Sequence, residues 1–325
     1  MRVLVTGASG FVGRHLIRAL KDAGHEVAAC SRSRVEQPGI FYVVSPELGP
    51  GADWTAALAG VDAVVHLAGL AAVDGPGNSA GLEGEYRKVN VEGTRALAKQ
   101  AAKAGVKHFV FMSSLHAVAA NSDERLSEQT EPHPVSAYGR SKLAAEKAIQ
   151  EELRTSGCAW TILRPPLVYG PGNQANFGLL LKLVKTGIPF PLASVCNRRS
   201  FIYVENLVDL ISKCLGNAKA FGKVYLPSDG EDLSTAQLIE KIARAETRDL
   251  KPQCTGDGCT APRGARLFPF PESLLKAAGR LPGLGALRKL TSSLYVDSEP
   301  IRRDLGWTPP FTMEEGLIRT LEKRL

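Results

Sequence analysis

The sequence predicts an α/β protein with a doubly wound parallel sheet and a smaller C-terminal lobe. Short apolar runs alternate with longer helix-like stretches through the first half of the chain. Three glycines, at positions 7, 10 and 13, follow directly on the first apolar run. After Pro165 this alternation gives way to recurring proline and glycine. Alternating strands and helices are typical of a parallel sheet with helices on both faces, and 325 residues suffice for a large core.

Five runs are expected to form buried parallel strands, because each is short and apolar on both faces. They are Val3–Val5, Val27–Cys30, Ala63–Leu67, Phe109–Met112 and Thr161–Leu163. The helix-like stretches between them are Val12–Ala23, Thr55–Ala59, Glu92–Ala104 and Ala137–Ser156. Connections between the strands are expected to be right-handed.

The glycine triplet lies within Thr6–Gly13, where the first predicted strand meets the first predicted helix. In this arrangement the first glycine allows a tight turn, the second lets backbone approach a pyrophosphate, and the third lets the helix pack close to the sheet. The helix N-terminus then presents free N–H groups to the phosphates. The segment therefore predicts a Rossmann-like, dinucleotide-binding first half. Its expected cofactor contacts are Gly7, Gly10, Phe11, Val12 and Gly13.

A tyrosine and a lysine stand four residues apart, at Tyr138 and Lys142, on one face of a predicted helix. A free tyrosine has a pKa of about 10. A nearby ammonium favours the phenolate, which suits the phenol to proton transfer near neutral pH. The alternative is a surface pair on an amphipathic helix. The glycine triplet upstream, and Ser113 and Ser114 at the end of a predicted strand, favour the catalytic interpretation.

Together these motifs resemble the extended short-chain dehydrogenases/reductases of the sugar-nucleotide epimerase/dehydratase/reductase kind, over nearly the whole chain. The matching segments are Thr6–Gly13, Asp62–Gly69, Val89–Thr94, Phe111–Ser114, Tyr138 with Lys142, Arg164–Pro171 and Leu305–Pro309. The resemblance implies a Rossmann domain of residues 1–167 plus roughly 196–226, and a substrate-binding lobe of roughly 168–195 and 227–325. Within the second half, Ser200–Glu205 and Lys223–Leu226 are expected to return to the main sheet.

The same resemblance implies three catalytic residues, Ser114, Tyr138 and Lys142. Ser114 would hydrogen-bond the reacting oxygen, although the adjacent Ser113 stays open as an alternative register. Lys142 would hold the nicotinamide ribose and tune Tyr138. Dehydratase members carry an Asp-Glu pair just after the serine, whereas this chain has Leu115–Ala117, so an elimination needing those carboxylates is not expected. His116 either contacts substrate or simply packs.

Cofactor choice is read at the end of the second predicted strand, where NAD-specific members often carry an acidic residue. This chain has Ser31, Arg32, Ser33 and Arg34 there. An arginine can pair with a 2′-phosphate, which favours NADP and leaves NAD as the alternative; the arginines could instead face solvent. The family pattern implies further cofactor contacts at Leu67, Ala68 and Gly69, and a cover over the nicotinamide from Pro165 to Val168.

The substrate-binding residues implied by the resemblance lie in the second half of the chain. Asn176 follows a Tyr-Gly-Pro-Gly segment, where family members place an asparagine on a sugar nucleotide. Arg199, in preference to Arg198, would bind a diphosphate through two hydrogen bonds, with a solvent salt bridge as the alternative. Leu192 and its neighbours could cover a nucleobase.

The subgroup that the chain resembles most contains reductases of a UDP-linked 4-keto-6-deoxy-N-acetylhexosamine, associated with bacterial surface-polysaccharide synthesis. The expected reaction delivers hydride to C4 while Tyr138 donates a proton to the carbonyl oxygen. Three alternatives stay open. They are a UDP-hexose 4-epimerase with tightly held NAD, a reductase of a non-sugar alcohol or ketone such as a steroid, and a non-catalytic nucleotide-sensing module.

Composition argues against several other classes of protein. The net charge of +7 comes without a nucleic-acid motif or an aromatic-interleaved basic run, so no nucleic-acid partner is expected. No apolar stretch reaches the ~18 residues of a membrane span, and no signal peptide is read, so a cytoplasmic protein with free thiols is expected. The six scattered cysteines suggest no metal site. Ser273–Leu290 reads as a lobe helix or, alternatively, a membrane-surface helix, and a homodimer through the two long predicted helices is an alternative to a monomer.

Overall fold

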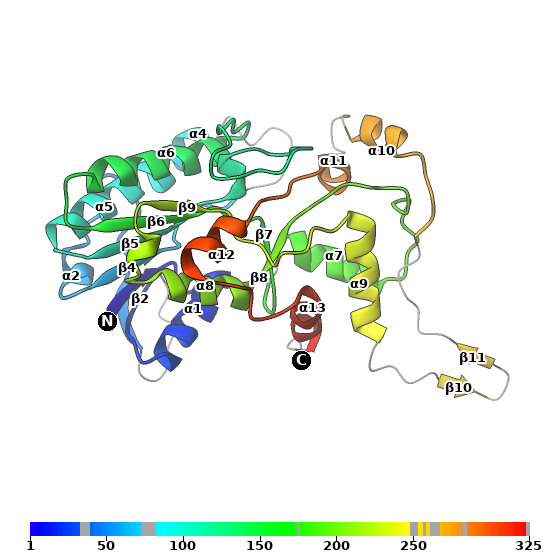
Figure 1. Cartoon of the computed structure of the whole chain (residues 1–325), viewed down its shortest axis with the longest axis horizontal. Coiled ribbons are helices and arrows are strands. Elements are labelled where there is room, and N and C mark those ends of the chain that lie inside the picture. The colour runs from blue at the N-terminus through cyan, green and yellow to red at the C-terminus, as the bar shows by residue number, and fades with distance from the viewer. Residues whose placement is uncertain are drawn as a thin grey trace.

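The computed structural model describes residues 1–32, 40–72, 82–173, 176–247, 253–255, 258–260, 267–279, 281 and 285–322. Arg34, one of the two arginines that favour NADP, lies outside these residues. Figure 1 shows two parts of the molecule: a broad sheet with its flanking helices, and beside it a smaller group of helices.

The main sheet has seven strands in the order β3-β2-β1-β4-β5-β6-β9, all of them parallel. The strands are β1 (Arg2–Thr6), β2 (Glu26–Ser31), β3 (Phe41–Val44), β4 (Ala63–His66), β5 (His108–Met112), β6 (Ala159–Leu163) and β9 (Lys223–Tyr225). The order reverses direction between β1 and β4, which is where ligands bind in sheets of this kind. The predicted doubly wound α/β fold is confirmed.

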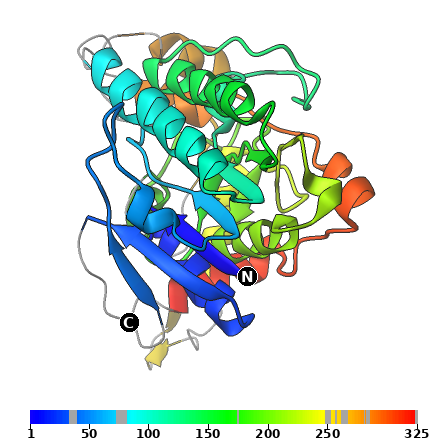
Figure 2. The ribbon, with the colours of Figure 1, turned by 90° about the vertical axis from the view of Figure 1, so that its left-hand side faces the viewer.

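Helices cover both faces of this sheet (Figures 1 and 2). On one face α5 and α6 run side by side, with α2 near them; on the other, α1 packs against α8. The helices and short helical turns of this part are α1 (Phe11–Asp22), α2 (Thr55–Leu58), α4 (Glu83–Tyr86), η1 (Arg87–Glu92), α5 (Gly93–Lys103), η2 (Leu115–Ala117), α6 (Ala137–Leu153), α8 (Val204–Cys214) and η3 (Ala218–Ala220). Each face has its own apolar core, because the strands are buried on both sides.

The smaller lobe is built around a second, two-stranded parallel sheet, β7 with β8. Its elements are β7 (Leu167–Tyr169), α7 (Asn176–Lys185), β8 (Phe201–Tyr203), α9 (Thr235–Thr247), β10 (Gln253–Thr255), β11 (Gly258–Thr260), α10 (Glu272–Ala278), α11 (Gly285–Thr291) and α13 (Met313–Glu322). Helix α12 (Glu299–Leu305) packs instead against η3 and the core of the main sheet. Tyr169, Phe201 and Tyr203 share an apolar core with α7, α9 and α13. The chain crosses from the main sheet into this lobe directly after β6.

The structure corrects part of the expected strand set. Lys223–Leu226 does return to the main sheet, as β9 beside β6, but the expectation for Ser200–Glu205 is wrong. There β8 pairs with β7, because Phe201 and Tyr203 are buried in the lobe core, and the backbone N–H of Tyr203 donates to the Asp229 carboxylate. The edge strand β3 was not predicted; two of its four side chains are exposed, so it lacks a buried-strand pattern.

The basic segment Ser273–Leu290 does not form one long helix. Two short helices, α10 and α11, cover most of it and pack against each other. Leu275 supplies the buried contact of α10, while Leu274 is exposed. The residue ranges of the Rossmann domain and the substrate lobe stay a prediction.

Candidate active site

The glycine triplet forms a tight connection between β1 and α1. Gly7 has a φ of +69°, and a Cβ there would lie 2.8 Å from the backbone nitrogen of Ala68. A Cβ on Gly13 would lie 2.3 Å from the carbonyl oxygen of Gly7. Gly10 is the N-cap of α1, with no side-chain hydrogen bond to the first turn. Helix α1 therefore begins with backbone N–H groups that no side chain caps. The space beside Gly7 and Gly13 would be filled by any side chain at those two positions. These features fit the diphosphate of a dinucleotide.

Three buried polar side chains, linked by hydrogen bonds, lie beside the glycine loop. Thr6 Oγ1 lies 2.7 Å from His66 Nδ1, and His66 Nε2 lies 2.9 Å from Thr94 Oγ1. Thr6 Oγ1 also accepts from the backbone N–H of Ala68 at 3.2 Å. Burial, aided by the charge of Lys142, lowers the pKa of His66 to about 3. A neutral His66 thus joins β1, β4 and α5 beneath Leu67, Ala68 and Gly69.

The end of β2 carries the residues expected to select the cofactor. Ser31 is buried and is the last residue of the strand, while Arg32 follows it and is exposed. The backbone carbonyl of Ser31 accepts from the N–H of Ser45, which holds this end beside β3. An exposed guanidinium next to the glycine loop is available to a 2′-phosphate, and the NADP preference stays a prediction.

Helix α6 carries Tyr138 and Lys142 one turn apart, at its N-terminal end. Its N-cap is Ser136, whose side chain accepts from the N–H of Gly139 at 3.0 Å. A Cβ on Gly139 would lie 2.2 Å from the carbonyl oxygen of His116. Glycine after Tyr138 therefore lets α6 approach η2 closely, and that contact brings Tyr138 next to Ser114, with which it shares a hydrogen bond.

The electrostatics of this cluster favour a protonated Tyr138. Burial raises the pKa of Tyr138 above its ordinary value, opposed by the hydrogen bond with Ser114 and reinforced by Tyr86. Burial lowers the pKa of Lys142 to about 8, although Glu146 raises it. Lys142 Nζ donates to the carbonyl oxygen of Met112 at 3.0 Å. The expectation that Lys142 favours the phenolate is not met, because burial raises the pKa of the phenol rather than lowering it. The contact of Lys142 with a nicotinamide ribose stays a prediction.

Two further rings border Tyr138. The ring centroid of His116 lies 6.2 Å away and that of Tyr86 lies 6.0 Å away. The sequence analysis missed Tyr86, which is buried and donates to the carbonyl oxygen of Ala71. Its spacing of four residues from Asn90 was the available signal. Asn90 itself bonds the Leu70 backbone and donates to Ser141 Oγ.

The segment after β6 reaches the same edge of the sheet. Pro165 is buried, and its carbonyl oxygen accepts from the N–H of Leu115 at 2.9 Å. Val168 is half-buried in β7. The Pro165–Val168 segment thus lies directly beside the turn that holds Ser114, as a cover over a nicotinamide requires.

The residues expected to bind substrate are less closely grouped. Asn176 begins α7, and its side chain lies outside the described part of the structure. Leu192 is 2% exposed and packs in the lobe core. Arg199 Nη1 donates to the carbonyl oxygens of Lys289 and Ser292, at 2.7 and 3.1 Å. That nitrogen of Arg199 therefore already caps the end of α11.

The neighbouring Arg198 is exposed, and its Cζ lies 4.9 Å from the ring centroid of Tyr295. Burial lowers the pKa of Arg199. A burial argument therefore favours Arg199 as a rigid cation, and an accessibility argument favours Arg198. Which of them contacts a diphosphate stays a prediction.

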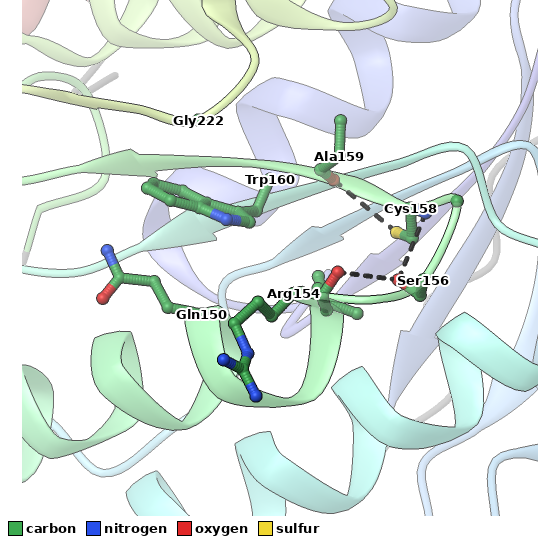
Figure 3. Close-up of a pocket in the computed structure, with 9 residues that line it drawn as sticks. Gln150, Arg154, Ser156, Cys158, Ala159, Trp160 and Gly222 are labelled. Atoms are coloured by element: carbon green, nitrogen blue, oxygen red, sulfur yellow. Dashed lines mark hydrogen bonds between the residues drawn. The ribbon is translucent and has the colours of Figure 1, made fainter.

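A shallow pocket of about 550 Å³ lies away from this cluster (Figure 3). Its lining includes Gln150, Arg154, Cys158 and Trp160. Ala159 and Trp160 begin β6, so the pocket lies at the amino ends of the strands. Because Tyr138 and the glycine loop lie at the carboxyl ends, this pocket is not part of the candidate site.

Two further findings concern metal binding and membrane spans. Among the described residues, no group of three or more His, Cys, Asp or Glu side chains is arranged to hold a metal ion. In the same part of the chain, no helix combines the length and apolar character that crossing a membrane requires.

Comparison with known proteins agrees with this geometry. A sequence model of the NAD dependent epimerase/dehydratase family matches residues 3–226. The chain belongs to this family. It is 36% identical to a UDP-glucose 4-epimerase of Vibrio cholerae over 326 residues, covering 98% of this chain and 94% of that protein. It is 30% identical to a 2-alkyl-3-oxoalkanoate reductase of Stenotrophomonas maltophilia, covering 98% of both chains.

Among solved structures, the chain resembles MoeE5 in complex with UDP-glucuronic acid and NAD. The TM-score is 0.77 at 26% identity, with 99% of this chain and 98% of that one covered. Family membership confirms that the chain is an enzyme of the short-chain dehydrogenase/reductase type. Its relatives include proteins named as epimerases and a protein named as a reductase.

Proposed function

We propose that this enzyme reduces the C4 ketone of a UDP-linked 4-keto-6-deoxy-N-acetylhexosamine, with NADPH as the preferred reductant. The observation that carries the proposal is the protonated Tyr138 beside Ser114. Burial raises the pKa of the phenol, so near neutral pH it can donate a proton. When hydride adds to the carbon of a ketone, the oxygen develops negative charge and needs a proton from such a donor.

The residues divide the work as follows. Ser114 donates a hydrogen bond to the ketone oxygen and orients it towards Tyr138. Tyr138 transfers its proton to that oxygen as the C4 centre becomes tetrahedral. Lys142 holds the nicotinamide ribose, and as an ammonium it stabilises the phenolate that Tyr138 leaves behind.

The cofactor contacts follow from the glycine loop. Gly7, Gly10 and Gly13 leave space for the diphosphate, and the first N–H groups of α1 bind it. Arg32 pairs with the 2′-phosphate, Leu67–Gly69 line the adenine and ribose, and Pro165–Val168 covers the nicotinamide. When bound, the dinucleotide supplies the hydride.

The choice of a UDP-sugar rests on relatives. The Vibrio cholerae relative is named a UDP-glucose 4-epimerase, and MoeE5 was solved with a UDP-sugar and NAD. The reductase of Stenotrophomonas maltophilia, with a substrate that is not a sugar, supports net ketone reduction on this fold. A non-sugar ketone is therefore the alternative substrate class that the experiments have to distinguish from a UDP-sugar.

A 4-epimerase is the second candidate, because the relative at 36% identity carries that name. Epimerisation would use the same three residues in both directions, starting with Tyr138 as a base. It would also require a retained NAD, whereas the end of β2 offers Arg32 in place of a carboxylate.

Two measurements test the proposal. Mass spectrometry of nucleotides released from the purified protein identifies the cofactor; a reductase should yield substoichiometric NADP(H), and an epimerase stoichiometric NAD. The purified enzyme is then given the UDP-linked 4-keto sugar with NADPH or NADH. One equivalent of reductant consumed per sugar is expected. Interconversion of UDP-N-acetylhexosamine C4 epimers without net reductant use would overturn the reductase assignment.

Arg32→Ala tests the cofactor preference. It should weaken NADPH binding by about tenfold, the value of roughly one charge-assisted hydrogen bond, and leave NADH binding unchanged. Fluorescence titration of both cofactors measures this. An equal effect on the two would mean that Arg32 faces solvent in the complex.

A further inference from the structure

A buried ion pair stands directly behind the catalytic residues. Arg164 donates to the Glu146 carboxylate through Nε at 3.0 Å and Nη2 at 2.6 Å. Ser113 Oγ donates to the same carboxylate. The side chains of Glu146 and Arg164 are only 3% and 7% exposed. A buried pair of this kind is weak evidence for stability, since burying both charges costs about as much as their attraction returns.

Glu146 joins the three segments that present the site. It stands on α6 one turn after Lys142, on the same face. Through Ser113 it holds the residue before Ser114, and through Arg164 it holds the residue before Pro165. Further backbone bonds run from Ser113 to Leu163 and from Leu115 to Pro165. One carboxylate thus fixes the ends of β5 and β6 against α6.

We propose that Glu146 is a positioning residue of this enzyme, holding Ser114, Lys142 and Pro165 in register and keeping Lys142 in its ammonium form. The inference rests on the proposed function, in which Lys142 acts as a cation. The motifs of the sequence do not mark Glu146, although it follows Lys142 by the same four residues that separate Lys142 from Tyr138.

Several titratable or charged groups lie around Lys142. Glu146 on α6 and His66 on β4 interact with it electrostatically. Arg164, at the end of β6, is paired with Glu146. Tyr138 lies one turn before Lys142 on α6, and Tyr86 lies beside Tyr138. His66 is neutral, because burial lowers its pKa to about 3, and Arg164 is a cation. Glu146 is therefore the one anion in this set.

The charge of Glu146 acts on the pKa of Lys142. Burial lowers the pKa of Lys142 to about 8 and Glu146 raises it. Without the anion, Lys142 loses its proton at a lower pH, so the ammonium disappears earlier as pH rises. Glu146→Gln should move the titration midpoint of Lys142 down by roughly one pH unit, typical of losing a neighbouring opposite charge.

Nuclear magnetic resonance of ¹³C-lysine-labelled protein measures this midpoint without any substrate. The spectrum of Lys142→Arg identifies the Lys142 signal. A midpoint near pH 8 is expected for the wild type, and a lower one for Glu146→Gln. An unchanged midpoint would overturn the charge part of the inference, whether or not the enzyme proves to be a sugar-nucleotide reductase.

Two matched variants separate the effects. Glu151→Gln removes an exposed carboxylate from the same helix, where it pairs with Arg95 at 2.9 Å, and should leave the Lys142 midpoint unchanged. Ser113→Ala removes a hydrogen bond to Glu146 and no charge. It should keep the wild-type midpoint and lower turnover several-fold; full turnover would overturn the positioning part.

Glu146→Gln could also unfold the protein, since Arg164 would be left without its partner. The double variant Glu146→Leu with Arg164→Met replaces the pair by apolar side chains of similar size, which proteins often tolerate. Its melting temperature should stay near that of the wild type. Its Lys142 midpoint should move less than that of Glu146→Gln, because the Arg164 cation is removed together with the Glu146 anion. Its turnover should still fall several-fold, because Ser113 has lost the carboxylate that holds it. A folded double variant with wild-type turnover would refute the positioning role of Glu146.

Discussion

The candidate binding groups in the two halves of this molecule are of different kinds. Those for the diphosphate of a dinucleotide are backbone: the first N–H groups of α1, beside the space left by Gly7 and Gly13. Those in the lobe are side chains on separate segments, such as Arg199, which donates to carbonyl oxygens at the end of α11. Backbone sites leave a fixed spacing in the sequence, whereas converging side chains do not. Sequence motifs therefore predict the candidate binding residues of the first half, whereas those of the second half are brought together only in the structure.

Tyr138→Phe tests the centre of the sheet half and carries the largest expected effect. It removes the proton donor and keeps the ring, so turnover should fall by roughly 10²–10⁴-fold while cofactor affinity stays nearly constant. Steady-state kinetics and cofactor titration check this. Tyr86→Phe is the matched control, since its hydroxyl donates to the Ala71 carbonyl, and it should cost much less. Retention of half the turnover by Tyr138→Phe would remove Tyr138 from the mechanism.

Gly13→Ala tests whether backbone space is the basis of cofactor binding. The new Cβ would meet the Gly7 carbonyl oxygen at 2.3 Å, and such overpacking costs about 1–3 kcal/mol. Dinucleotide affinity and melting temperature should both fall. Gly51→Ala is the control, because nothing lies within 4 Å of its Cβ. Equal behaviour of the two variants would mean that the loop can shift without loss.

Acid should affect the two halves with opposite sign. Burial lowers the pKa of His66 to about 3, so the unfolded chain binds the proton more tightly. Stability is complete above about pH 6.5 and is lost as pH falls towards 3, by about 2 kcal/mol at pH 5. His66→Gln should remove that share of the pH dependence in urea unfolding at pH 7 and 5.

In the lobe, burial raises the pKa of Asp229 to about 6. The folded state then binds the proton more tightly, so this group adds stability as pH falls through 6. Asp229→Asn should make the loss between pH 7 and 5 steeper by about 1 kcal/mol. A flatter profile for Asp229→Asn would contradict the assignment of opposite signs.

The last pair of variants separates the two lobe arginines. Arg199→Ala should lower UDP affinity about ten- to a hundredfold. It should also lower the melting temperature, because two carbonyl oxygens lose their donor. Arg198→Ala should leave the melting temperature unchanged. Calorimetry with UDP decides the matter: a loss of affinity confined to Arg198→Ala would move the diphosphate to that residue.

Much of the sheet half follows from the sequence, for identifiable reasons. The glycine spacing, the Tyr138–Lys142 spacing and the apolar strands each reflect a constraint within a few neighbouring residues. The sheet to which β8 belongs was predicted wrongly because its pairing depends on a core that Phe201 and Tyr203 share with Tyr169, which lies more than thirty residues earlier in the chain. Leu192 illustrates the same limit, since an apolar residue beside proline gives no sign of whether it faces a core or a ligand.

The wide helical turn η1 has a consequence for the neighbourhood of Tyr138. From Glu83 to Lys103 the chain forms one continuous helix whose middle turn, Arg87–Glu92, is π-helical. A π turn holds one residue more than an α turn. Successive residues of a π turn are therefore separated by a smaller angle than those of an α turn. The residues before this turn are rotated relative to Asn90 from where an uninterrupted α-helix would place them. The π turn thus helps to set the direction of Tyr86, whose ring centroid lies 6.0 Å from that of Tyr138.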